Sequence, residues 1–231
     1  MAKKSLLFDT STVISLVTNN MLWVLPELKK KFDGRFLVAP AVYQEMIKVP
    51  MNSRKYKFEA MVVCEYIHHG HIKVCDNIKL EPKTDAMMSL TNSIYKIKER
   101  NLNLFHRGEM DTVVLAMALG NSAIATDERS TRMLIEDPKR LAKILSMKLH
   151  AKVKIQKDKL KQFREKVGKM QVLRSTEIGM LAIEHGLLDE FYAHHTKQDV
   201  VDAVLWGLKT RGCAISGEEI DGYIQLASKK T

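Results

Sequence analysis

The sequence predicts an α/β fold in which a central parallel sheet is covered by helices on both faces. Short apolar runs alternate with segments of helical periodicity from residue 5 to about residue 155, and this alternation is typical of parallel βαβ units. Two of the runs, residues 5–9 and 122–127, end in an aspartate and resemble buried strands followed by helices. With 231 residues, 45% of them apolar, the chain can bury one good core with an appendage.

The first elements are expected in the order β-α-α-β-α. A strand at residues 5–9 leads into a helix that begins near Ser11 or Thr12, and a second helix covers about residues 21–32. The next strand is expected at residues 36–39. Pro40 then stands at the first position of a helix, where its missing N–H costs nothing.

The middle of the chain continues the alternation. The pattern predicts a strand at 71–75 between helices at 54–67 and about 83–100, and a helix from 106 that ends at Gly120, a good C-terminal cap. The following elements are expected to be a strand at 123–126, a helix at 128–135, a helix that starts at Pro138, and a last strand at 152–155.

From Lys157 onward only helical periodicity is found. Helices are expected at about 157–169, 176–185, 198–211 and 216–226, with Ser216 as the cap of the last one and Glu219 at the reciprocal position. No linker rich in Pro, Gly or Ser separates this part. We therefore expect an α/β domain at residues 1–156 and a basic helical extension at 157–231 that packs on the same domain.

Four carboxylates that are far apart in the sequence fall at related places in this fold. Asp9 and Asp127 follow strands, and the carboxyl edge of a parallel sheet is where ligands bind. Glu45 and Asp111 lie in helices on faces shared with apolar residues, which is costly unless something cationic meets them. The sequence therefore predicts that the four acids converge.

Converging carboxylates repel one another, and at neutral pH they need protons or cations to coexist. Oxygen ligands favour Mg²⁺ or Mn²⁺, so the pattern predicts metal-assisted hydrolysis of phosphodiester bonds. The alternative is that Asp9 and Asp127 are helix N-caps, each accepting a hydrogen bond from a backbone amide. Taken position by position, both interpretations remain open; taken as an ordered set, the four acids favour the metal site.

Positive charge is concentrated in one segment. Thirteen Lys or Arg against two acids lie between Lys139 and Arg174, a net charge of +11 in a chain of net charge +10. A segment of one sign indicates a polyanion as partner, and nucleic acid is the natural one. An anionic membrane surface is disfavoured because the helix at 157–169 lacks a bulky aromatic face. The residues expected to bind RNA are Lys152, Lys154, Lys157, Lys159, Lys161, Arg164, Lys166 and Lys169.

With these residues in view, the chain resembles the PIN-domain ribonucleases, a family that includes the toxin nucleases of toxin–antitoxin pairs. The resemblance rests on four segments in order: 7–11 (LFDTS), 38–45 (VAPAVYQE), 108–116 (GEMDTVVLA) and 125–129 (ATDER). They span residues 5 to about 135, a little over half of the chain. Order and spacing carry the resemblance, because no single motif is specific.

The resemblance implies a three-layer α/β/α sandwich and Mg²⁺- or Mn²⁺-dependent cleavage of RNA, frequently by a homodimer. It assigns Asp9, Glu45, Asp111 and Asp127 to the catalytic and metal-binding acidic cluster. Accessory roles fall to Glu109 and to the hydroxyls of Thr10, Ser11 and Thr126. Glu109 and Asp111 are about 200° apart around an ideal helix. We therefore expect Asp111 to be the inner ligand, and Glu109 to be either an acid behind the metal ligands or a ligand of a second metal ion.

The C-terminal part departs from a simple toxin. Residues 180–188 and 200–224 are similar to the last helices of a subgroup of uncharacterised PIN proteins, in which that segment follows the last strand more directly. The basic stretch at 157–169 looks inserted here. No antitoxin partner is assigned.

One other function stays open: a non-catalytic RNA-binding module in RNA processing or ribosome biogenesis that works through the basic segment. The full set of acids favours the nuclease. A phosphatase of the haloacid-dehalogenase type would need a second acid where Ser11 stands. No run approaches the ~20 apolar residues of a membrane span. The apolar stretch before Asp9 is too short to be a signal peptide. The three cysteines lack a disulfide pattern. A cytoplasmic protein is expected.

Overall fold

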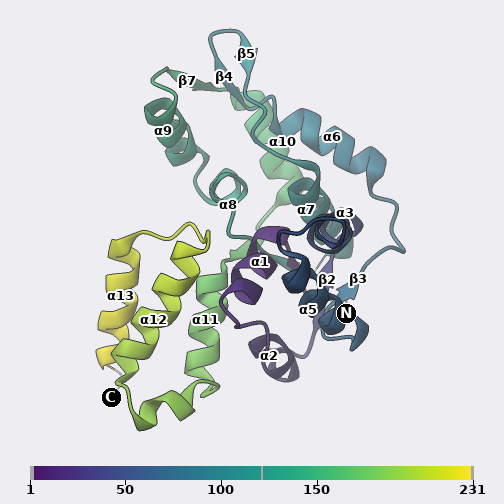
Figure 1. Ribbon diagram of the computed structural model, residues 1–231. Coiled ribbons are helices and arrows are strands. Elements are labelled where there is room, and N and C mark those ends of the chain that lie inside the picture. Colours follow the sequence, from purple (N-terminus) through teal and green to yellow (C-terminus); the bar gives the residue numbers. More distant parts are fainter. Residues whose placement is uncertain (1–2, 121, 230–231) are drawn as a thin grey trace.

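The computed structural model describes residues 3–120 and 122–229, and its core is a five-stranded parallel sheet (Figure 1). The strand order across the sheet is β3-β2-β1-β6-β8. These strands are β1 (Ser5–Phe8), β2 (Arg35–Val38), β3 (Lys73–Val74), β6 (Ser122–Ala125) and β8 (Gln171–Leu173). A second, three-stranded antiparallel sheet has the order β5-β4-β7 and is made of β4 (Tyr95–Ile97), β5 (Arg100–Asn101) and β7 (Val153–Ile155).

Helices connect the strands and form the C-terminal part. The helices up to the second sheet are α1 (Thr10–Thr18), α2 (Val24–Phe32), α3 (Pro40–Tyr43), the π-helical turn η1 (Gln44–Lys48), α4 (Val49–Met51), α5 (Lys57–His68) and α6 (Glu81–Thr91). The later ones are α7 (Arg107–Leu119), α8 (Arg129–Glu136), α9 (Pro138–Lys148), α10 (Lys157–Val167), α11 (Ser175–Glu184), the 3₁₀ turn η2 (Asp189–Ala193), α12 (Lys197–Thr210) and α13 (Gly217–Lys229).

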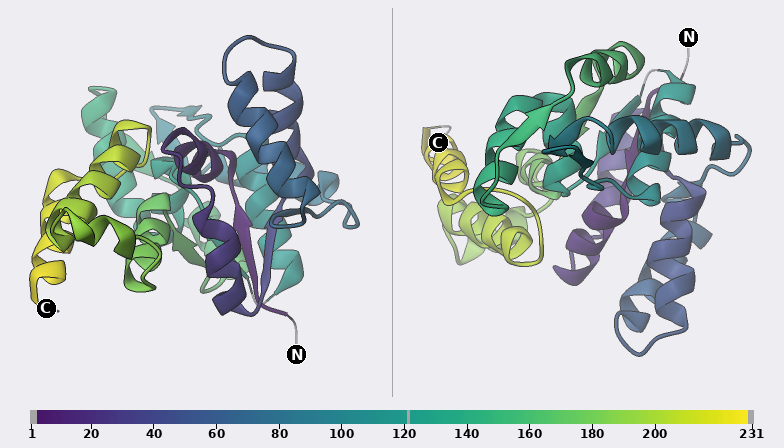
Figure 2. Two further views of the ribbon diagram at one scale, coloured as in Figure 1. Left: turned by 60° about the horizontal axis from the view of Figure 1, so that its bottom comes forward. Right: turned by 90° about the horizontal axis from the view of Figure 1, so that it is seen from above.

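The helices form a layer on each side of the sheet, so the predicted three-layer α/β/α architecture is confirmed. In one layer α1 contacts α5 and α11, and α11 also contacts α2. In the other layer, α7 lies against β1 and β6, and α6 and α10 pack on α7 (Figure 2). Strands in the middle of such a sandwich are buried on both faces, as in β1, where all four residues are buried.

The direction in which successive strands are added to the sheet changes at β1. The chain moves from β1 to β2 and β3 on one side and later returns to β6 on the other side. Phe8 pairs with Val38 of β2 and with Ala125 of β6, so the residues after these three strands lie at one edge. Asp9 and Asp127 were predicted at this edge, and the structure confirms that placement. The carboxyl edge beside a reversal of strand order is the usual ligand site of an open α/β sheet.

The prediction of one long helix at residues 83–100 is wrong. α6 ends at Thr91, and a hairpin of β4 and β5 follows. Asn92 explains the break, because its side-chain oxygen accepts hydrogen bonds from the amides of Leu104 and Phe105 at 2.8 and 3.0 Å, and its amide nitrogen donates to the Phe105 carbonyl at 3.1 Å. These contacts hold a distant loop against the end of α6 and turn the chain away from the helix axis.

Two strand predictions near the end of the α/β region also need correction. Residues 153–155 form a strand, but it pairs with β4 in the small sheet instead of closing the main one. The main sheet is completed by β8, which lies after Lys157, in a part that was expected to be wholly helical. The expected boundary at residue 156 therefore divides elements that pack together, since α10 contacts α6 and α7 and β8 pairs with β6.

The C-terminal helices α11 to α13 pack in sequence order (Figure 1). The predicted cap of α13 is confirmed: the Ser216 amide donates to the Glu219 carboxylate at 2.9 Å, and the Glu219 amide donates to the Ser216 hydroxyl at 3.1 Å. Buried Arg174 joins the helices through Glu177 of α11 and Glu219 of α13, at 2.5 and 2.9 Å. All three cysteines are free thiols. None of the described helices is long and apolar enough to cross a membrane.

Candidate active site at the carboxyl edge of the sheet

Asp9 is a buried carboxylate held by hydroxyl groups. It follows β1 and precedes α1, and it is 4% exposed. Its Oδ2 atom accepts hydrogen bonds from the Ser11 hydroxyl at 2.6 Å and from the Thr126 hydroxyl at 3.0 Å. Burial raises the pKa of Asp9 above its usual value, and the two hydroxyl bonds oppose that rise only in part.

Glu109 lies in the first turn of α7, close enough to Asp9 for the charge of Asp9 to affect its pKa. Burial is the main reason that the pKa of Glu109 is raised to about 8, and the negative charges of Asp9 and Glu128 add to the rise. Its Oε2 atom accepts a hydrogen bond from the Thr131 hydroxyl of α8 at 2.5 Å. Of the two acids of α7, Glu109 is therefore the one whose pKa is affected by the charge of Asp9.

Glu45 is exposed, and it lies against the start of α1, which follows Asp9, and the start of α7, which contains Glu109. Its Oε2 atom accepts a hydrogen bond from the Thr10 hydroxyl at 2.7 Å, next to Asp9 in sequence. A Cβ atom on Gly108, next to Glu109, would lie 2.6 Å from both carboxylate oxygens of Glu45. Gly108 therefore makes room for this carboxylate at the positive N-terminal end of α7.

Asp111 turns away from these acids. It is 6% exposed, and its Oδ1 atom accepts a hydrogen bond from the Thr84 hydroxyl of α6 at 2.5 Å. The backbone amide of Ala41 in α3 also donates to this carboxylate. Burial raises the pKa of Asp111, against the effects of the Thr84 bond and of nearby Arg107. Asp111 thus ties α7 to α6 and α3, a different task from the inner metal ligand expected from the sequence.

Asp127 is likewise engaged elsewhere. It is 2% exposed, and its two carboxylate oxygens accept hydrogen bonds from the amide and the hydroxyl of Ser175, each at 2.7 Å. Ser175 is the first residue of α11. Asp127 therefore satisfies an orphan amide at the start of that helix, as an N-cap does. The sequence left a capping role open for Asp127, but for the helix that directly follows it.

The predicted accessory hydroxyls link the two strand ends. Ser11 bonds Asp9 and also accepts a hydrogen bond from the Asp127 amide at 3.0 Å. Thr126 bonds Asp9 and accepts from the Glu128 amide at 3.2 Å. Ser11 and Thr126 thereby fix the Asp9 carboxylate against β6, whereas Thr10 serves Glu45.

The structure thus places Asp9 and Glu109 near each other, sets Glu45 against the adjoining residues Thr10 and Gly108, and directs Asp111 and Asp127 to neighbouring helices. In the described ranges no three Asp, Glu, His or Cys side chains are gathered closely enough to hold a metal ion. Sequence reasoning missed the hydroxyl partners Thr84, Thr131 and Ser175. Only Ser175 has a sequence signal, since it follows the short apolar run of β8 just as Ser11 closely follows β1.

The predicted RNA-binding residues are all exposed, and they lie on β7, on α10 or directly beside these elements. The buried face of α10 presents Leu160, Phe163 and Val167 to the core, and its lysines lie outside. Only Lys161, 4.0 Å from Glu165, has an acidic partner among these residues in the part that the structure describes. Lys154 of β7 stands directly opposite Lys96 of β4, an unfavourable cross-strand pair that a bound anion would relieve.

Models of known protein families, characterised proteins and solved structures were compared with the chain, and none matches it. The resemblance to the PIN-domain ribonucleases stays a prediction from the sequence motifs.

Proposed function

We propose that this protein is a divalent-metal-dependent ribonuclease that hydrolyses RNA phosphodiester bonds at the carboxyl edge of its parallel sheet. The observation that carries the proposal is a pair of carboxylates, buried Asp9 and half-buried Glu109. Both have raised pKa values, each is held by hydroxyl groups, and neither forms an ion pair within the described residues.

The chemistry of these residues fits a hard divalent cation. Two neighbouring carboxylates that are shielded from solvent are costly as bare anions, and a cation removes that cost. Carboxylate oxygens are the ligands that Mg²⁺ and Mn²⁺ prefer. Asp9 and Glu109 would hold the ion, and exposed Glu45 is a further acid beside them, since it is bonded to Thr10 and packed on Gly108. The additional ligands would be water and phosphate oxygens, which are usual for Mg²⁺.

A bound divalent cation lowers the pKa of a water nucleophile and stabilises charge on the phosphate. The protein's own groups orient the two acids: Ser11 and Thr126 fix Asp9, and Thr131 fixes Glu109. Asp111 and Asp127 act as positioning residues, because they lock α6 and α11 against the edge that carries the site. Their loss is expected to reduce activity through disorder of that edge.

The exposed lysines and arginines of the second sheet and α10 support RNA as the substrate. Among the described residues, only Lys161 of this group has an acidic partner, and exposed Lys154 faces half-buried Lys96 across neighbouring strands. Such a surface binds phosphates and makes the affinity fall with salt. In this proposal the basic segment binds the RNA, and the acids at the carboxyl edge of the sheet hydrolyse it.

A second function has a specific observation in its favour. Every acid of the predicted quartet has a hydroxyl partner, and in the described ranges no three potential ligands converge. An RNA-binding module that works through the basic segment, in RNA processing or ribosome biogenesis, would need nothing more. The two functions differ in one measurable property, which is whether bound RNA is cleaved.

The deciding experiment incubates the purified protein with labelled single-stranded and structured RNAs and Mn²⁺, beside an EDTA control. Asp9→Asn removes the charge at the centre of the site with little change in shape, and Asp221→Asn makes the same change on the exposed face of α13. We expect metal-dependent cleavage that Asp9→Asn abolishes and Asp221→Asn leaves intact, with RNA affinity retained in both. Salt-sensitive binding without cleavage in any sample would instead support the RNA-binding module.

A further inference from the structure

The segment from α3 to α5 forms a helical arm (Figure 2). A hollow partly lined by this arm lies beside Glu45. The hollow has a volume of ≈ 300 Å³, at the lower end of the range for small-ligand sites. Val13 and Val17 of α1 form part of its wall, and Val49 and Tyr56 of the arm form another. It is thus a mostly apolar recess with a candidate catalytic carboxylate at its border.

Tyr56 occupies a backbone conformation that a bulky residue rarely adopts. Its φ and ψ angles are 62° and 15°, in the left-handed region that favours glycine. Burial does not explain this strain, because the residue is 45% exposed. A strained aromatic residue at the wall of a recess indicates that its ring has a task there.

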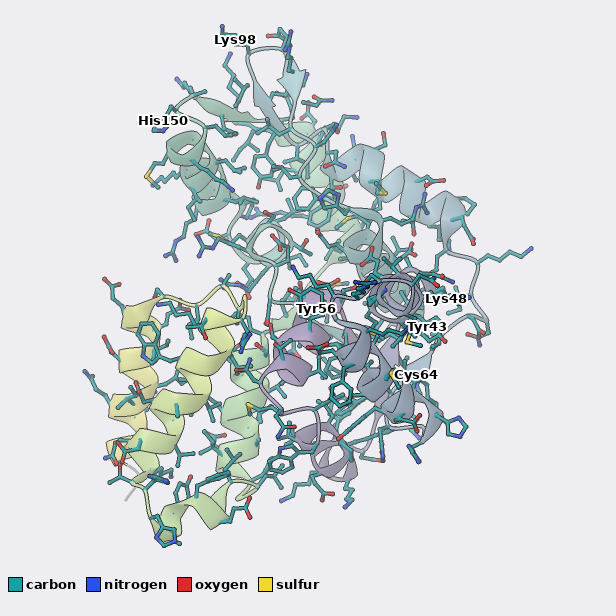
Figure 3. The ribbon with its side chains drawn as sticks, in the orientation of Figure 1. Tyr43, Lys48, Tyr56, Cys64, Lys98 and His150 are labelled. Carbon is teal, nitrogen blue, oxygen red and sulfur yellow. The ribbon has the colours of Figure 1, made fainter. Side chains whose placement is uncertain are left out.

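Lys55 lines the recess together with the acids Glu45 and Glu59, and further cations stand close to it in the sequence. Lys48, Arg54, Lys55 and Lys57 are exposed, and none of them forms an ion pair with an acid in the part of the chain that the structure describes. The ammonium of Lys55 lies 4.7 Å from the centre of the Tyr56 ring, and that of Lys48 lies 6.0 Å from the Tyr43 ring. Figure 3 labels Tyr43, Lys48 and Tyr56 on the arm.

Exposed aromatic rings among unpaired cations are the pattern that single-stranded nucleic acids select, because each base offers a face for stacking and each phosphate a charge. The basic segment at residues 139–169 lacks this pattern: its described large apolar residues with high exposure are Met147 and Leu149, and neither is aromatic. Its lysines suit backbone phosphates in any RNA. The recess suits a base.

We propose that this recess binds an unpaired nucleobase of RNA, stacked on Tyr56, with the neighbouring phosphates held by Lys48 and Lys55. The inference deepens the proposed function, on which its placement beside a cleavage site rests, and it makes unpaired RNA the preferred substrate. Duplex RNA would bind the basic segment without filling the recess. A base in the recess would bring the adjoining phosphate toward Glu45.

The test measures binding without cleavage, in EDTA, by fluorescence anisotropy. The probes are a short labelled single-stranded RNA, the same strand in a duplex, and the single strand with abasic positions. Tyr56→Asn is the main variant, because asparagine tolerates the left-handed backbone and folding is preserved. Trp206→Ala is the matched control, since Lys209 lies 4.2 Å from the Trp206 ring on α12, away from the arm.

We expect Tyr56→Asn to weaken single-strand binding roughly tenfold, the loss typical of one stacked base, with duplex binding unchanged. Tyr56→Phe should retain the affinity, Trp206→Ala should have no effect, and the abasic strand should bind the wild type as weakly as the intact strand binds Tyr56→Asn. Equal losses for single strand and duplex, or none, would overturn the base site. So would a change confined to self-association in sedimentation, which would make the arm a protein contact.

Failure of this inference and failure of the proposed function are distinguishable. A wild type that cleaves with Mn²⁺ while Tyr56→Asn binds and cleaves normally keeps the nuclease and removes the base site. A wild type that never cleaves, with single-strand affinity that still depends on Tyr56, keeps the base site and removes the nuclease.

Discussion

Both oxygens of the Asp127 carboxylate accept hydrogen bonds from Ser175, one from its amide and one from its hydroxyl, each at 2.7 Å. This contact joins the end of β6 to the first turn of α11, at a buried position. A carboxylate that satisfies a helix amide in this way stabilises the protein whether or not it also takes part in chemistry.

We expect Asp127→Ala to lower the free energy of unfolding by about 1–3 kcal/mol, because a buried amide and hydroxyl lose their acceptor. Ser175→Ala should cost less, since the amide bond survives, and the double variant should lose less than the sum of the two. Urea unfolding of the three variants measures this coupling. A variant Asp127→Ala with normal stability and no cleavage would instead identify Asp127 as a metal ligand.

Gly108→Ala is expected to separate activity from stability. Alanine is favoured over glycine in a helix by roughly 0.5–1 kcal/mol, but its Cβ would lie 2.6 Å from both oxygens of Glu45 and displace that carboxylate. Thermal unfolding should show an intact or slightly more stable fold, and cleavage should fall to the level of Glu45→Gln. The control is Gly222→Ala in α13, where a Cβ meets nothing within 4 Å and activity should persist. Full activity in Gly108→Ala would show that the position of Glu45 is immaterial.

The stability of the metal-free protein should depend on pH through Glu109. The folded-state pKa of about 8 lies above the ordinary value of 4.5, so between these values the folded protein binds more protons than the unfolded one. Stability therefore falls as pH rises from about 4.5 to about 8. Glu109→Gln should flatten this slope and raise the midpoint of thermal unfolding at pH 8 by several degrees, since about 1 kcal/mol corresponds to roughly 2–4 °C in a chain of this size.

The measurement is thermal unfolding in EDTA from pH 5 to about 8.5, with Glu218→Gln on the exposed face of α13 as a control that should leave the slope unchanged. Added Mn²⁺ should stabilise the wild type most at high pH, where it replaces the proton, and should have a smaller effect on Glu109→Gln. Parallel pH curves for the wild type and Glu109→Gln would mean that Glu109 is ionised as in solvent.

Lys154→Glu should stabilise the fold while it weakens RNA binding. The change replaces a repulsive cross-strand contact with Lys96 by an attractive one, which is worth roughly 0.2–1 kcal/mol. It also removes positive charge from the proposed RNA surface, so the affinity and its salt dependence should both fall. Lys148→Glu, at the exposed end of α9, should lower affinity without the gain in stability. Unchanged RNA affinity in Lys154→Glu would exclude the second sheet from the interface.

The central strands could be predicted because their signals are local. β1, β2 and β6 are short apolar runs, and Pro40, Gly120 and Ser216 mark helix ends by their own backbone chemistry. β8 could not be predicted in the same way, because it has only three residues and begins with a glutamine. It is a strand because β6 offers it a partner, and that is a tertiary effect.

The break after α6 was missed for a similar reason. Met87, Leu90 and Ile94 keep a helical spacing, and nothing near Asn92 shows that its side chain will bind the amides of Leu104 and Phe105. For the candidate site, the sequence placed Asp9 and Asp127 at strand ends but could not give the direction of each carboxylate. Asp9 is oriented by the nearby hydroxyls of Ser11 and Thr126. The carboxylates of Asp111, Glu109 and Asp127 are oriented by hydroxyls from three other helices, those of Thr84, Thr131 and Ser175 respectively.

The late position of β8 has a consequence for biosynthesis. The ribosome must complete the second sheet and α10, residues 126–170, before the strand that flanks β6 exists. Until then the nascent chain presents β6 as an open edge, a template on which other chains can pair. Asp127 also lacks Ser175 at that stage. β8 is therefore the last strand of the main sheet to be assembled, and a chain that ends before it would be prone to aggregate through β6.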